Sequence, residues 1–318
     1  MAGLGAAPWA QDLLWEWMDS IRATLGDAYL PIHAPLVRKQ LDESWGDIAI
    51  KARQRDAQNL TEYGCGAFGC ALPTTGGLTL KVTSDVQEAW FAALAVGRSG
   101  HFTAGVSAVH AVFAVPGARH LARPVFFVWR EAALSPGTLH HALASVPAHT
   151  PSGRSLHAHA SMLDRARIFG LQLAGYFLYC TETSNVAEWF RLLAELRAPL
   201  DDEHAAWVTD LVDGRPPRDV HEFHRELSEN DRTPAFFGTM LGAYRGLLMR
   251  VARESPELRA VAQSVLRWQA TGVVLPDLHA GNLMRIERDG APVWGLVDQG
   301  VALPMDENLY RVEIPTLR

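Results

Sequence analysis

The spacing of hydrophobic positions changes near residue 130, and the segment before this point has the pattern of a β-sheet. Residues 78–82 alternate apolar and polar side chains, as a half-buried strand does. Residues 106–115 and 124–129 are rich in valine and phenylalanine, which are favoured in strands. We therefore predict a small antiparallel-sheet domain at residues 60–131.

Beyond the sheet segment, hydrophobic positions recur every three or four residues, which indicates helices. Proline is favoured as the first residue of a helix, directly after a capping serine or threonine. Three helix starts of this kind are predicted at Ser135-Pro136, Thr233-Pro234 and Ser255-Pro256. Residues 132–318 are therefore predicted to form a mostly helical domain, and residues 1–59 an N-terminal helical extension. The expected fold class is α+β.

Polar residues suited to phosphate chemistry follow the last predicted helix. An apolar run at residues 273–275 leads to Asp277, and Asn282 comes five residues later. The dipeptide Asp289-Gly290 predicts a two-residue turn between short strands, and this hairpin would return the chain so that Asp298 lies beside Asn282. Phosphoryl transfer needs a carboxylate near the attacking hydroxyl and oxygen ligands for Mg²⁺, and these side chains have the right chemistry.

A glycine-rich segment lies upstream and has the pattern Gly64-x-Gly66-x-x-Gly69, with Ala67 and Phe68 inside it. Glycines let backbone N–H groups approach phosphate oxygens closely. Many glycine-rich turns bind nothing, and a dinucleotide fingerprint would need a helix directly afterwards. A strand follows here instead, so we interpret the glycines as part of a hairpin over the sheet.

Lys81 lies inside the predicted strand at residues 78–82. It is either an edge-strand lysine that faces solvent or a lysine that reaches the phosphates of ATP. Residues 84–87 have the form of a capping box that opens a helix, and Glu88 is the acid in that helix best placed to pair with Lys81. Asp85 is the competitor for this pairing.

Composition and charge exclude several classes of protein. The chain has 318 residues, 48% hydrophobic and 20% charged, and its formal net charge of −6 does not indicate a nucleic-acid surface. No apolar run is long enough for a membrane span, and the three cysteines suit a reducing compartment, so we expect a cytoplasmic protein with neither membrane nor nucleic-acid partners. The histidine pairs at 157/159 and 221/224 have spacings that also suit exposed helix faces, so a metal role is not favoured.

Together, these motifs resemble the protein-kinase-like superfamily. Their order along the chain is that of the family: glycine loop, strand lysine, helix glutamate, linker, catalytic loop and metal-binding aspartate. The resemblance covers about residues 60–135 and 270–302. It implies a bilobal fold in which a small antiparallel-sheet lobe binds the nucleotide and a mostly helical lobe carries the catalytic loop.

The resemblance also implies a role for each matching residue, with ATP and Mg²⁺ as cofactors. The glycine loop would cover the phosphates, and Lys81 would contact phosphate and pair with Glu88. Asp277 would accept or orient the acceptor hydroxyl. The backbone near the linker would meet the adenine edge. The implied nucleotide-binding residues are Gly64, Gly66, Ala67, Phe68, Gly69, Lys81, Glu131 and Ala132, and the implied metal ligands are Asn282 and Asp298.

The sequence also departs from the protein-kinase pattern. Leu275-Pro276 stands where His-Arg usually precedes the catalytic aspartate, so regulation through a phosphorylated activation loop is not expected. His279 stands where a lysine is common, which resembles the aminoglycoside and choline phosphotransferases. The metal motif reads Asp-Gln-Gly rather than Asp-Phe-Gly. We expect the helical region at 135–272 to take the place of the C-terminal part that follows the metal motif in protein kinases.

The expected function is therefore transfer of the γ-phosphate of ATP to a hydroxyl group. A protein acceptor is slightly favoured, because the acidic runs at 135–272 read as helix starts rather than as a site for a polycation. A small-molecule acceptor, a non-catalytic pseudokinase module and nucleotidyl transfer are the alternatives. Tests with labelled ATP distinguish these possibilities.

Overall fold

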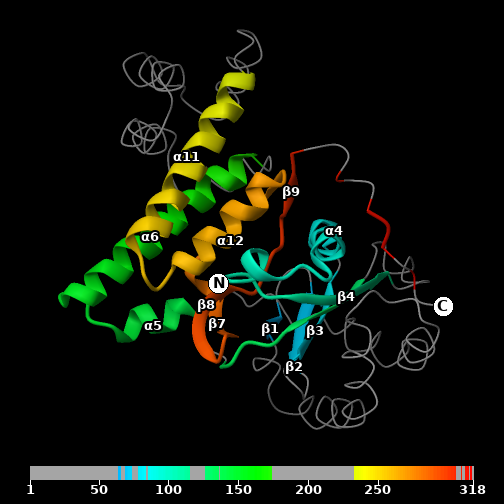
Figure 1. Cartoon of the computed structure of the whole chain (residues 1–318), viewed down its shortest axis with the longest axis horizontal. Coiled ribbons are helices and arrows are strands. Elements are labelled where there is room, and N and C mark those ends of the chain that lie inside the picture. The colour runs from blue at the N-terminus through cyan, green and yellow to red at the C-terminus, as the bar shows by residue number, and fades with distance from the viewer. Residues whose placement is uncertain are drawn as a thin grey trace, which may run out of the picture. The chain divides into compact units, whose positions relative to one another are not determined.

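The computed structural model describes part of the chain (Figure 1). The described residues are 64–65, 69–73, 78–83, 85–114, 126–135, 137–173, 233–305, 309, 312–314 and 316. The predicted helical extension at 1–59 lies outside them. So do Gly66, Ala67 and Phe68 of the glycine loop and the histidine pair at 221/224.

The protein is a mixed α+β structure with small antiparallel sheets and several helices, as predicted. Its larger sheet has the strand order β1-β2-β3-β5-β4, and all neighbouring strands are antiparallel. The strands are β1 (Gly64–Cys65), β2 (Gly69–Pro73), β3 (Leu78–Thr83), β4 (Val109–Ala114) and β5 (Phe126–Glu131).

Two strand boundaries differ from the predicted ones. β4 begins at Val109 rather than Val106, because Val106 forms an isolated parallel bridge to Leu296 and Ser107 N donates to Leu296 O at 2.9 Å. β5 runs on to Glu131, since it lies between β3 and β4 and its ladder continues to Leu78.

β5 pairs with β3 on one side and β4 on the other, and it is buried along most of its length. All of its residues from Phe126 to Arg130 are buried, and Trp129 packs edge-on against Phe113 and Phe127. A strand that is buried on both faces shows a continuous apolar run rather than alternation. The one charged side chain in this run, Arg130, therefore needs a specific partner.

Helix α4 (Val86–Ala95) packs against β4 and β5 and starts at a side-chain cap. Asp85 Oδ1 accepts hydrogen bonds from the backbone N–H groups of Gln87 at 2.8 Å and Glu88 at 3.2 Å. These bonds satisfy two of the N–H groups that a helix start leaves without partners. Asp85 is thus a capping residue, and Glu88 lies on the buried face of the helix.

The predicted hairpin after Asn282 is confirmed. Strands β7 (Leu283–Arg288) and β8 (Ala291–Leu296) pair, and both turn residues between them have positive φ, 51° at Asp289 and 77° at Gly290. Positive φ at both central positions is the geometry of a type I′ turn, which suits the twist of paired strands. The end of the hairpin joins the segment before β4, where Leu296 N donates to Gly105 O at 3.0 Å.

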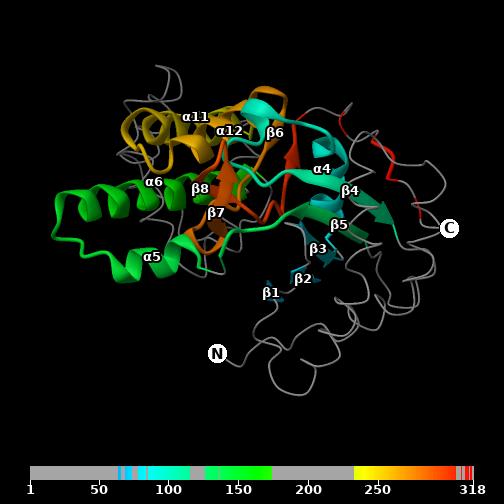
Figure 2. The same ribbon diagram turned by 60° about the horizontal axis from the view of Figure 1, so that its bottom comes forward.

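The described helices of the remaining region are α5 (Leu139–Ser145), α6 (Pro151–Leu173), α11 (Thr233–Glu254) and α12 (Arg259–Ala270). α6 and α11 lie side by side, and α11 also packs on α12 (Figures 1 and 2). Short strands β6 (Val273–Val274) and β9 (Leu303–Pro304) pair antiparallel beside them. No described helix is long and apolar enough to cross a membrane.

Two of the predicted helix starts are wrong. α5 begins at Leu139, not Pro136, because Thr138 is its cap and forms a capping box with His141. α12 begins at Arg259, not Pro256: Ser255 Oγ accepts from Leu258 N at 3.2 Å and holds a turn there instead. In both places the Ser-Pro dipeptide marks the connection before the helix rather than the helix itself.

The chain separates into two compact units by its internal contacts. The first contains residues 1–136, 285–300 and 306–318, and the second contains residues 137–284 and 301–305. The predicted domains placed the β7–β8 hairpin with the helical part, whereas its contacts group most of it with the sheet.

Candidate functional site

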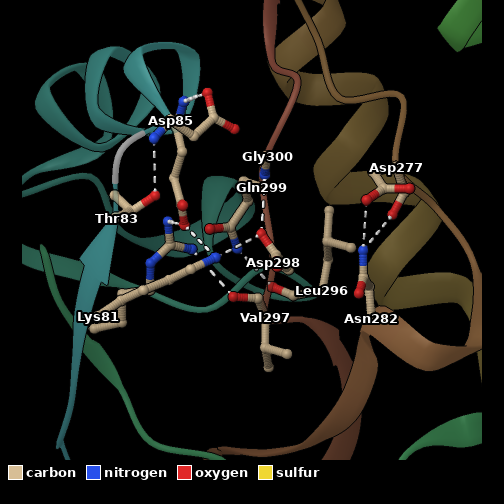
Figure 3. Close-up of polar contacts among 12 residues, drawn as sticks. Lys81, Thr83, Asp85, Asp277, Asn282, Leu296, Val297, Asp298, Gln299 and Gly300 are labelled. Carbon is tan, nitrogen blue, oxygen red and sulfur yellow. Dashed lines mark hydrogen bonds and ion pairs between the residues drawn. The ribbon is translucent and has the colours of Figure 1, made fainter. Parts of the chain in front are cut away.

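In the first unit, an ion-pair cluster forms around Lys81 of β3 (Figure 3). Lys81 Nζ lies 2.8 Å from Glu88 Oε1 on α4 and 2.9 Å from Asp298 Oδ1 after β8. The lysine side chain is 13% exposed and Glu88 is 1% exposed, so the ion pair between them is shielded from water. The structure therefore brings together three of the residues that the sequence singled out, from three separate segments.

Arg130 completes this cluster, although the sequence motifs did not indicate it. Its Nη2 donates to Glu88 Oε1 at 2.6 Å, and its Nη1 donates to the backbone O of Val297 at 3.1 Å. The Arg130 side chain is 3% exposed. An arginine within the otherwise apolar run of β5 was the available signal, since a charge at a buried position requires partners.

The charges of this cluster shift two pKa values. Partial burial alone would raise the pKa of Asp298, but the positive charges of Lys81 and Arg130, with hydrogen bonds from Lys81 and Gly300 N, lower it to about 2. Burial alone would lower the pKa of Lys81, but Asp298 and Glu88 together outweigh it and raise the pKa above 10.5. Asp298 is therefore an anion and Lys81 a cation throughout the physiological range.

The lowered pKa of Asp298 predicts a pH-dependent stability difference. A carboxylate whose pKa falls from 3.8 to about 2 on folding stabilises the protein above pH 3.8, and this stabilisation disappears as pH falls towards 2. We expect the free energy of unfolding of the native protein to exceed that of Asp298→Asn by a constant amount above about pH 5. The difference should shrink in more acid solution, and urea unfolding at a series of pH values measures it. A difference that does not change down to about pH 3 would contradict the assignment.

Gln299 directly follows Asp298, and its side chain is buried and hydrogen-bonded. Its Nε2 donates to Ser107 Oγ at 3.1 Å and to Leu296 O at 2.7 Å, and the side chain is 1% exposed. Directly before it, Asp298 Oδ1 accepts from Gly300 N at 3.1 Å. Hydrogen bonds from Gln299 and Gly300 therefore help to fix the segment that carries Asp298.

The glycine-loop residues that the structure describes, Gly64 and Gly69, lie in adjacent antiparallel strands. Gly64 pairs with Ala71 across β1 and β2, and Gly69 pairs with Thr83 across β2 and β3. β2, which begins at Gly69, is therefore the direct neighbour of β3, the strand that carries Lys81.

The predicted linker residues Glu131 and Ala132 differ in whether their polar groups already have partners. The carboxylate of Glu131 forms a two-pronged ion pair with Arg288 and also accepts from Ala108 N at 3.1 Å, while Glu131 N donates to Ala108 O at 2.9 Å. Ala132 is half-buried, and its backbone makes no hydrogen bond to another described residue. Both carboxylate oxygens of Glu131 are thus already paired with described residues, whereas the polar backbone groups of Ala132 are not.

In the second unit, Asp277 and Asn282 are in direct contact (Figure 3). Asn282 Nδ2 donates to Asp277 Oδ2 at 2.8 Å and to Asp277 O at 3.2 Å. Both acceptors are oxygens, so they fix which end of the amide is nitrogen. The other end, Asn282 Oδ1, is thereby directed away from Asp277 and is an oxygen of the kind that Mg²⁺ binds.

Two residues near Asp277 carry further charge or hydrogen-bonding capacity. Arg167 of α6 donates from Nε to Asp277 Oδ1 at 2.9 Å, a contact the sequence analysis did not anticipate. His279 Nε2 lies 3.7 Å from the same oxygen. Helical periodicity placed Arg167 on a predicted helix, but no local pattern indicates that it meets a loop 110 residues later in the sequence.

The loop that carries Asp277 is held by a buried tyrosine and a closely approaching helix. Tyr244 of α11 is fully buried, and its hydroxyl donates to Leu275 O at 2.8 Å. Burial raises the pKa of this hydroxyl, so it remains a neutral donor. On α6, a Cβ added to Gly170 would lie 2.8 Å from Pro276 Cβ, so only glycine leaves room for the proline. Leu275 and Pro276 are thus fixed by neighbouring helices.

Replacing Tyr244 with phenylalanine is expected to lower the free energy of unfolding by about 1–3 kcal/mol. The ring packing is retained, but the buried carbonyl of Leu275 loses its donor and is not reached by water. Urea unfolding of the two proteins measures the difference. A loss below about 0.5 kcal/mol would mean that the hydroxyl does not hold this carbonyl.

The residues present suit a metal ion that arrives with its substrate rather than a resident metal. Among the described residues, no group of three or more His, Cys, Asp or Glu side chains could hold a metal by itself. Mg²⁺ usually takes one or two carboxylates together with substrate phosphates and water, not an all-protein cage. Asp298 in the first unit and Asn282 in the second each present an oxygen of the kind that Mg²⁺ binds.

Comparisons with protein-family models, with curated proteins and with solved structures found no significant match to this chain.

Proposed function

We propose that this protein is an ATP- and Mg²⁺-dependent phosphotransferase with a bilobal protein-kinase-like fold. The observation that carries the proposal is the position of Lys81, whose Nζ joins Glu88 and Asp298 at 2.8 and 2.9 Å. Asp298 lies 217 residues from the lysine in sequence, so no local pattern produces this contact. A strand lysine paired with a helix glutamate and a metal-binding aspartate is the arrangement that kinase chemistry requires.

In the proposed reaction, residues of the first unit bind the nucleotide. Lys81 contacts the phosphates and is oriented by Glu88, the turn between Gly64 and Gly69 covers the phosphates, and the Ala132 backbone meets the adenine edge. Lys81 moves from Asp298 to the phosphates when the nucleotide binds. Asp298 is then an uncompensated anion that can bind the metal.

Residues of the second unit act on the acceptor. Asp277 accepts a hydrogen bond from the acceptor hydroxyl and orients its oxygen, and Asn282 both fixes Asp277 and offers Oδ1 to Mg²⁺. The hydroxyl oxygen forms a bond to the γ-phosphorus, the bond to the β–γ bridging oxygen breaks, and ADP leaves. Asp277 receives the hydroxyl proton. Bound Mg²⁺ supplies positive charge that offsets the charge on the phosphate oxygens.

We propose a protein hydroxyl as the acceptor in preference to a small molecule. A polycationic small molecule would be recognised by clustered carboxylates. The acidic runs of the helical region, such as the one at 201–203, are instead predicted to be helix starts, which argues against a site for a polycation. A small-molecule acceptor of another charge remains the alternative.

Labelled ATP tests the proposal. The purified protein is incubated with Mg²⁺, an acceptor panel of protein and small-molecule hydroxyl compounds, and either γ-labelled or α-labelled ATP. Transfer of the γ-label that disappears in Asp298→Ala supports phosphoryl transfer. Transfer of the α-label would instead identify nucleotidyl transfer, and ATP binding without transfer of either label would identify a non-catalytic binding module.

A further inference from the structure

Arg167 of α6 contacts the carboxylate of Asp277 from outside the Asp277–Asn282 loop. Its Nε lies 2.9 Å from Asp277 Oδ1, and the two side chains are 19% and 20% exposed. An ion pair with this degree of burial is screened less by water and salt than a surface pair. The position of the arginine is fixed by α6, because Gly170, about one turn further on, lets the helix approach Pro276 closely.

The two oxygens of Asp277 have different partners. Oδ1 accepts from Arg167 Nε, and Oδ2 accepts from Asn282 Nδ2 at 2.8 Å. Two donors on different oxygens fix the plane of the carboxylate. Each carboxylate oxygen can accept two hydrogen bonds, so these contacts leave capacity for an acceptor hydroxyl.

His279 does not take the place of Arg167 in this arrangement. Its Nδ1 accepts from Gly281 N at 3.0 Å, so Nε2 carries the hydrogen in the neutral ring. Nε2 lies 3.7 Å from Asp277 Oδ1, which is too long for a hydrogen bond. The ring lies close over Gly281, where an added Cβ would come within 2.8 Å of it, and the bond from Gly281 N holds it there. The permanent positive charge bonded to Asp277 therefore comes from α6.

We propose that Arg167 is a positioning residue for the phosphoryl transfer assigned above, and this inference rests on that proposed function. Arg167 holds Oδ1 so that the carboxylate has one orientation when the acceptor hydroxyl arrives. It also places a charge that does not titrate beside the reacting groups. A guanidinium suits this role better than an ammonium, because its planar fork loses less freedom for each hydrogen bond it forms.

Substitution of Arg167 by methionine tests the inference. A misplaced catalytic group costs about 10²-fold in rate, so we expect kcat to fall by about that factor while KM for ATP changes little. Arg154→Met, an exposed arginine of the same helix, is the matched control and should retain full activity. Arg167→Lys should recover part of the lost kcat, since it keeps the charge but not the geometry.

Two rescue measurements separate positioning from a general loss of structure. Guanidinium ion at millimolar concentration should restore part of kcat to Arg167→Met in a saturable way, whereas urea at the same concentration should not. Introducing His279→Lys into Arg167→Met should also restore activity, because a longer cation at 279 can reach the same oxygen. Unchanged kcat in Arg167→Met, or a loss that neither treatment reverses, would overturn the inference.

A double-mutant cycle on thermal unfolding tests the ion pair without any activity. If Arg167 and Asp277 interact, the effects of Arg167→Met and Asp277→Asn are not additive, and the double variant loses less stability than the sum of the two single losses. Additive shifts would overturn the inference even in an active enzyme. Coupled shifts in a protein that transfers no phosphate would retain the ion pair and reject both the proposed function and the catalytic role of Arg167.

Discussion

Replacing Asp277 with asparagine is expected to reduce the rate of phosphoryl transfer by about 10²- to 10⁴-fold, the range for loss of a positioned proton acceptor. Asparagine keeps the shape of the side chain, but its NH₂ or its single oxygen must replace a carboxylate oxygen that accepts from Asn282 or Arg167. The amide cannot accept the hydroxyl proton, so kcat should fall. Affinity for ATP should remain, because the residues proposed to bind the nucleotide belong to the first unit. Steady-state rates and direct ATP titration measure the two quantities.

Asp289→Asn is the matched control for this substitution. Asp289 is exposed in the type I′ turn, where its φ of 51° is one that asparagine adopts readily. It makes the same chemical change without touching the proposed site, and we expect native rates. An Asp277→Asn variant that transfers phosphate as fast as Asp289→Asn would remove Asp277 from the reaction.

Replacing Arg130 with methionine is expected to lower the free energy of unfolding by about 3 kcal/mol. Removing one partner of a buried ion pair leaves the other charge in a place where water cannot solvate it. Glu88 would keep Lys81 as a partner, which places the expected loss at the low end of the usual range. The backbone O of Val297 would also lose its donor. Urea unfolding measures the loss, and Arg250→Met on the exposed side of α11 is the control.

A second substitution tests whether the stability lost in Arg130→Met comes from an unpaired buried charge or from lost packing. Arg130→Met combined with Glu88→Met removes both members of the pair and restores neutrality around Lys81 and Asp298. Replacing a buried ion pair by apolar side chains is often neutral or stabilising, so the double variant should be more stable than Arg130→Met alone. If it is less stable by the sum of both losses, packing rather than charge explains the effect.

Patterns that depend on neighbouring residues were predictable from the sequence. The α+β composition, the strand that holds Lys81 and the hairpin around Asp289-Gly290 all follow from periodicity or turn chemistry. The pairing of Glu88 with Lys81 was also predicted, because Glu88 lies in the first turns of the helix that directly follows the lysine strand. Each of these features is determined within a short segment, where the order of residues is enough.

Contacts between distant segments were not predictable in the same way. Arg130, Arg167 and Tyr244 reach their partners only because of how strands and helices pack, and one sequence contains no record of that packing. The Ser135-Pro136 and Ser255-Pro256 starts failed for a related reason. Serine before proline suits a turn as well as a helix cap, and the neighbouring hydrogen bonds decide between them.

The ion-pair cluster around Lys81 restricts which substitutions can be accepted during evolution. Lys81 and Arg130 balance Glu88 and Asp298, so the charges sum to zero in a largely buried place. Replacing any one of these four residues by a neutral one leaves a net charge there and destabilises the protein until a second substitution removes an opposite charge. Related sequences should therefore differ at positions 88 and 130 together rather than one at a time. Covariation of these two positions would be visible in an alignment even where the overall sequence has diverged widely.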